Sequence, residues 1–99
     1  MPDQTIFHSR TIALGDAPVG FRGYIVALDA TVASGAGLPG PELERRLLEL
    51  GFVEGAKVEL LHQGLLGGDP IAVRVAASTI ALRRREAMAV VASAGESVP

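Results

Sequence analysis

The clearest pattern in the chain is an alternation of apolar and polar residues in two neighbouring segments. Along residues 57–62, Val58 and Leu60 fall on one face of an extended backbone, and the charged Lys57 and Glu59 fall on the other. Residues 71–75 repeat this pattern, with every second residue apolar. We therefore expect two half-buried strands whose apolar faces build one core. Five side chains are expected to turn inward together: Val58, Leu60, Ile71, Val73 and Val75.

A glycine-rich stretch, residues 64–70, separates these two strands. Two alternating runs joined by such a stretch are typical of a β-hairpin. The expected turn residues are Gly67, Gly68, Asp69 and Pro70. A phosphate-binding loop is disfavoured because that motif requires Lys and then Ser or Thr after its last glycine, whereas Asp69 and Pro70 follow here.

One helix is expected from about Pro41 to Leu50, with an apolar stripe at Leu43, Leu47 and Leu50. Pro41 suits a first helical position, and Gly51 is expected to end the helix in a left-handed conformation. Gly55 lies in the turn that leads to the next strand. The intervening Phe52 is expected in the core, since aromatic residues are scarce; if exposed, it would be an anchor for a partner.

The remaining apolar segments predict short strands separated by turns. These strands are expected at residues 11–14, 21–28, 80–83 and 88–92, and residues 83–87 are expected to close one tight helical turn between the last two. Together the elements predict a mainly β fold, a small closed barrel of five to six short strands with one α-helix, because no crossover helices are available for a parallel sheet. The domain is expected to span residues 11–92, with flexible tails at 1–10 and 93–99 and a mobile loop at 29–40.

Composition and charge reduce the number of function classes that fit the chain. The chain has 99 residues and a net charge of -2, and this charge disfavours nucleic-acid binding. The absence of cysteine favours a reducing, cytoplasmic location. No stretch resembles a secretory signal or approaches a membrane-spanning length, so direct membrane insertion is not expected.

Candidate chemistry is sparse. His8 and His62 lie in separate segments without metal-binding spacing, and on a regular strand His62 and Glu59 would point to opposite faces. The aspartates and serines have neither the pairing nor the flanking motifs that acid–base or nucleophilic catalysis requires. No metal site, no cofactor and no enzymatic activity are therefore expected. The residues in question are Asp16, Asp29, Asp69, Ser34, Ser78 and Ser93.

The basic run at 83–85 is the best candidate for function. On an extended backbone Arg83 and Arg85 would point to one side and Arg84 to the other, and none of the three can enter an aliphatic core unpaired. They either contact acidic groups of a partner, in a sharper version as an arginine finger on bound nucleotide, or form a solvated face paired with Glu86 or Glu59. The expected partner-binding residues are Gly51, Phe52, Arg83, Arg84, Arg85 and Glu86.

Three blocks give the chain a family resemblance. The segment LLELGFVEG at residues 47–55, the GGDP turn at 67–70 and IALRRREA at 80–87 resemble the FeoA family of bacterial ferrous iron uptake, in that family's order and spacing. The resemblance implies an SH3-like β-barrel and a cytoplasmic protein that associates with FeoB, a membrane transporter with a GTP-binding domain. FeoA-like domains also occur at the carboxyl end of metal-dependent repressors, but this sequence lacks the helix-turn-helix and dimerisation segments of those repressors. The chain departs from shorter family members at residues 29–41, where the loop is lengthened, and at Ala77 and Ser78.

Two functions follow as expectations. The first is a non-enzymatic accessory protein that binds and modulates the FeoB transporter through the helix exit at Gly51 and the edge from Arg83 to Glu86. The second is a sensor or carrier that binds Fe(II) directly, for which His62 would be the residue to test.

Overall fold

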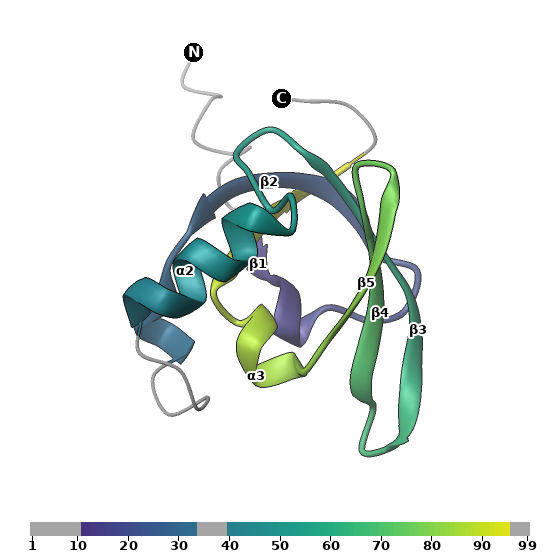
Figure 1. Ribbon diagram of the computed structural model, residues 1–99. Coiled ribbons are helices and arrows are strands. Elements are labelled where there is room, and N and C mark those ends of the chain that lie inside the picture. Colours follow the sequence, from purple (N-terminus) through teal and green to yellow (C-terminus); the bar gives the residue numbers. More distant parts are fainter. Residues whose placement is uncertain (1–10, 34–39, 96–99) are drawn as a thin grey trace.

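A computed structural model of the chain describes residues 11–33 and 40–95. Two 3-10 turns and the short helix α3 accompany one longer helix, α2, and six strands (Figure 1). In chain order the elements are β1 (Thr11–Ala13), η1 (Leu14–Asp16), β2 (Arg22–Leu28), η2 (Ala30–Ala33), α2 (Gly40–Glu49), β3 (Lys57–Leu66), β4 (Asp69–Val75), β5 (Ser78–Leu82), α3 (Arg84–Ala87) and β6 (Val90–Ala94).

The six strands form one sheet in the order β1-β6-β2-β3-β4-β5, and every neighbouring pair is antiparallel. The sheet curls around the core, with α2 and α3 on its concave side (Figure 1). The expected mainly β architecture with one main helix is therefore confirmed.

The interior of this curved sheet is aliphatic, as the alternation predicted. The five side chains expected to face inward are all buried, with at most 1% of their surface exposed. Helix α2 contributes Leu43 and Leu47 to the same core, and Phe52 joins them from the helix exit. Burying these large apolar side chains is the main favourable contribution to the stability of the fold.

Helix α2 ends in the hydrogen-bond pattern of a Schellman motif. The amide of Phe52 donates to the carbonyl of Leu47 at 3.0 Å, and the amide of Gly51 donates to that of Leu48 at 3.0 Å. Gly51 has a φ of 107°, a conformation that favours glycine. The motif turns the chain sharply and places Phe52 directly over the last turn of the helix.

The strand ladder leaves a seam, because β1 and β5 are the two ends of the strand order and are not hydrogen bonded to each other. The expectation of a closed barrel was wrong in this respect. Strand β5 is short, and the chain leaves it at Arg83 to form α3 instead of a longer strand. Helix α3 packs against η1 and β4, so a helix rather than a ladder covers this side of the core.

Two expected boundaries also differ. Strand β6 continues through Ser93 and Ala94, where Ser93 pairs with both Thr11 and Tyr24, so the ordered fold extends beyond residue 92. Part of the expected mobile loop is the 3-10 turn η2, in which the amide of Thr31 donates to the Asp29 carboxylate. The tail at 1–10, most of the tail at 93–99 and the loop segment 34–39 lie outside the described residues.

Candidate interaction surface

The arginine run starts helix α3 and does not continue strand β5. Arg83 precedes the helix in an extended conformation, and the next residues wind into a single turn. The helical turn expected at residues 83–87 is therefore confirmed, and the strand-like alternation expected for the three arginine side chains was wrong. In the structure Arg83 and Arg85 are exposed, whereas Arg84 and Glu86 are half-buried.

Arg84 is occupied by contacts within the fold. Its Nε donates to the Gly68 carbonyl at 2.9 Å, and its Nη2 donates to Gln63 Oε1 at 2.7 Å, both on the β3–β4 hairpin. Its Nη1 donates across the seam to the carbonyls of Gly15 at 3.2 Å and Ala17 at 2.8 Å. The planar guanidinium group can satisfy this many acceptors at once because its donors have a fixed fork geometry. Arg84 thus ties the hairpin to the segment after β1.

Two carboxylates complete the start of α3. Asp69 Oδ1 accepts the amide hydrogen of Arg84 at 2.7 Å, which attaches the helix to β4. Glu86 Oε1 accepts the amide hydrogen of Arg83 at 3.0 Å, and Glu86 Oε2 lies 3.8 Å from Nη1 of Arg46 on α2. These acidic groups cap the helix and are not available to a partner.

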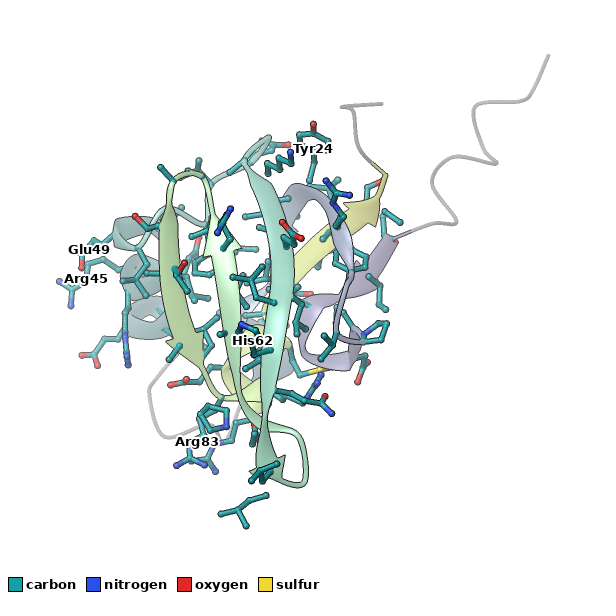
Figure 2. All side chains as sticks on the ribbon, turned by 90° about the vertical axis from the view of Figure 1, so that its right-hand side faces the viewer. Tyr24, Arg45, Glu49, His62 and Arg83 are labelled. Atoms are coloured by element: carbon teal, nitrogen blue, oxygen red, sulfur yellow. The ribbon has the colours of Figure 1, made fainter. Side chains whose placement is uncertain are left out.

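The side chains of Arg83 and Arg85 are the exposed part of the arginine run. In the part of the chain that the structure describes, neither has an ion-pair partner, since Glu86 is engaged by Arg46 and Glu59 by Arg22 at 4.0 Å. The alternative of a solvated face paired with Glu86 or Glu59 does not match this arrangement. Figure 2 shows Arg83 near the lower end of the β3–β4 hairpin, while Arg45 and Glu49 lie higher, at the left edge of the view.

The helix exit offers less surface than the sequence suggested. Phe52 has no exposed surface, so the structure corrects its placement among partner-binding residues and assigns it to the core. Gly51 is half-buried above Val75, and Gly55 is exposed in the turn before β3 with a φ of 89°.

The hairpin turn consists of Gly67 and Gly68, whose φ values of 70° and 82° fit a tight primed turn. The other two expected turn residues, Asp69 and Pro70, instead begin β4. Sequence reasoning missed the residues just before this turn. Leu65 and Leu66 are 100% and 86% exposed, which is unusual for two consecutive leucines.

The structure corrects the expected orientation of His62 relative to Glu59. The register between β3 and β4 shifts at Leu61, because Leu60 pairs with Val73 and His62 pairs with the next residue, Ala72. This bulge adds one residue, so His62 and Glu59 share the outer face of the sheet instead of opposite faces. His62 is exposed there (Figure 2). Among the described residues no three His, Cys, Asp or Glu side chains are grouped so as to hold a metal, and His8 lies outside them.

A shallow depression of about 200 Å³ lies on this outer face, between Lys57, Glu59 and Arg74. It is smaller than the pockets that usually hold organic ligands. It contains none of the predicted site residues.

Comparison with known proteins places this geometry in a family. The FeoA domain model matches residues 12–94, which include all of the elements from β2 to β6. The chain belongs to the FeoA family. A FeoA crystal structure from Stenotrophomonas maltophilia, complexed with zinc, is 33% identical with a TM-score of 0.65, over 83% of this chain and 89% of that one. That protein is described as a prokaryotic SH3-domain protein and a candidate activating factor of ferrous iron transport.

Other FeoA structures agree with this assignment. The solution structure of FeoA from Chlorobium tepidum is 30% identical with a TM-score of 0.65, over 84% of this chain and 70% of that one. A manganese-dependent transcriptional repressor shares the fold at 16% identity and a TM-score of 0.66, and its match spans 41% of the repressor chain. No curated protein sequence matches the chain. Within the described ranges, no helix has the length and apolar character needed to span a bilayer.

Proposed function

We propose that the chain is a non-enzymatic accessory protein of bacterial ferrous iron uptake that acts at the cytoplasmic side of a FeoB-type membrane transporter. Membership of the FeoA family supports the link to ferrous iron transport. The described residues group no metal ligands, and the aspartates at 29 and 69 serve turn and helix contacts instead of forming a catalytic pair. A role through binding and modulation of the transporter fits these observations.

One observation carries the proposal: Arg83 and Arg85 are exposed and, among the described residues, have no ion-pair partner, whereas the other charged residues of this helix end are engaged. A guanidinium group without an internal partner keeps its full capacity to meet a carboxylate on another protein. Charge complementarity of this kind raises the rate of association and selects the partner.

The test exchanges Arg83 and Arg85 for glutamate and leaves Arg84 intact, because Arg84 holds the fold together. We expect the R83E/R85E variant to bind the full-length transporter in lipid nanodiscs at least about tenfold more weakly than the wild-type chain, as measured by biolayer interferometry. Reversing the charges replaces attraction by repulsion and leaves the internal contacts of α3 in place.

A matched control carries the same charge change elsewhere. The R45E/K57E variant alters two exposed cations, one on α2 and one at the start of β3, and should bind within about threefold of wild type. Equal weakening in both variants would mean that only the net charge matters. Unchanged binding of R83E/R85E would remove these arginines from the interface.

A further inference from the structure

The turn end of the β3–β4 hairpin carries the most exposed apolar side chains among the described residues. Leu65 and Leu66 are 100% and 86% exposed, whereas the next most exposed large apolar residue, Val19, reaches 47%. Folding gains little from these two side chains, because both remain almost entirely in water. Adjacent apolar side chains left at a projecting turn are typical of residues that become buried in a complex.

The hairpin holds these leucines in a fixed position. Leu66 pairs with Asp69 across the turn, and a Cβ atom at Gly64 would clash with the carbonyl of Asp69, so the two strands are in close contact just before the tip. Arg84 binds the carbonyl of Gly68 and the side chain of Gln63 from the side of the body. A tip that is braced in this way loses little conformational entropy on binding.

The same brace joins the leucines to Arg83 and Arg85, which have no ion-pair partner among the described residues. Arg84 contacts the hairpin turn, so its two exposed neighbours in the chain are attached close to that turn, and Figure 2 shows Arg83 near the lower end of the hairpin. The result is a surface with an apolar projection and two cations at its base, on a chain with a net charge of -2. We call it the hairpin-tip surface, and it consists of Leu65, Leu66, Arg83 and Arg85.

We propose that the hairpin-tip surface inserts Leu65 and Leu66 into an apolar pocket of the partner protein, and that carboxylates at the rim of this pocket pair with Arg83 and Arg85. The inference rests on the proposed function and identifies the contact by which it operates. An apolar anchor surrounded by charge pairs is the usual arrangement of a strong contact between proteins.

Two other occupants fit the observations less well. A second copy of the chain, related by a twofold axis, would bring arginines of both copies together, and like charges repel across such a contact. A lipid bilayer would gain only two leucine side chains, and stable membrane anchoring generally needs a longer apolar insertion or several additional cations.

The experiment measures binding of the full chain to the full-length FeoB-type transporter in nanodiscs of phosphatidylcholine and phosphatidylglycerol, with empty nanodiscs alongside. The L65S/L66S variant is compared with L48S/V53S, which removes two apolar side chains that are 44% exposed each and lie elsewhere. We expect the tip variant to bind the transporter at least about tenfold more weakly and the control variant to bind within about threefold of wild type. Thermal unfolding of both variants checks that the fold is retained, which is expected of the tip variant because its leucines contribute little buried surface.

The outcomes separate the inference from the proposed function. If the wild-type chain does not bind the transporter, the proposed function fails, and the inference with it. If the wild-type chain binds and the tip variant binds equally well, the inference alone is overturned. Wild-type binding to empty nanodiscs that disappears in the tip variant would identify lipid as the occupant, and a dimer in sedimentation that disappears in the tip variant would identify a second copy. Either result would also overturn the inference.

Discussion

Replacing Phe52 by alanine is expected to lower the free energy of unfolding by about 3–5 kcal/mol, the usual cost of removing a fully buried aromatic ring. The ring has no exposed surface and joins the cluster formed by α2 and the sheet. In a domain of this size, such a loss lowers the melting temperature by roughly 15 °C or more. Urea denaturation followed by far-UV circular dichroism measures the effect, since the chain has no tryptophan to report on unfolding by fluorescence.

The adjacent Val53 provides the control for this prediction. Its side chain is 44% exposed, so V53A should change the free energy of unfolding by no more than about 0.5 kcal/mol. A loss below about 1 kcal/mol in F52A would show that the site can collapse around the missing ring, and that Phe52 is not the centre of the core.

The second large effect is expected at Arg84. Changing it to alanine removes four side-chain hydrogen bonds and should lower the free energy of unfolding by about 2–4 kcal/mol, because bonds to a charged donor contribute more than neutral ones. R84K keeps the positive charge but cannot reach both the hairpin and the segment after β1, so it should recover less than half of this loss.

R85A is the matched control, since Arg85 is exposed and has no ion-pair partner among the described residues. The free energy of unfolding of R85A should stay within about 0.5 kcal/mol of the wild-type value. Hydrogen exchange gives a second readout, because amides at the tip of the hairpin should exchange faster in R84A than in R85A if Arg84 braces the tip. Equal stability of the two variants would contradict a role of Arg84 in fastening the seam.

Regular repeats in the sequence predicted much of this fold. Period-two alternation identified the inward side chains of β3 and β4, and the leucine spacing identified α2 and its buried face. Gly51 indicated the helix end, and three short blocks indicated the family. These features depend on local backbone geometry, which sequence periodicity reports directly.

The candidate site was predicted only in part, because it depends on contacts between distant segments. Nothing in the run of three arginines distinguishes the middle one. Arg84 is engaged within the fold only because α3 packs beside the hairpin and Gly15, whose carbonyl groups accept its hydrogen bonds. Leu65 and Leu66 resemble core residues in sequence, and their exposure follows from the length by which the hairpin extends past α3. The bulge at Leu61 has no sequence signal of its own, since neither glycine nor proline marks it.

That bulge gives β3 a position at which its length can change. The extra residue sets the faces that His62 and Gln63 occupy, and a second register shift follows between Gln63 and Leu66, before the turn at Gly67. A chain shortened by one residue at Leu61 would keep Leu60 opposite Val73 and His62 opposite Ala72, so the strand would lose its bulge and keep its two faces. A deletion at a regularly paired position such as Glu59 has no extra residue beside it to lose, so it would shift the register of every pair up to the bulge.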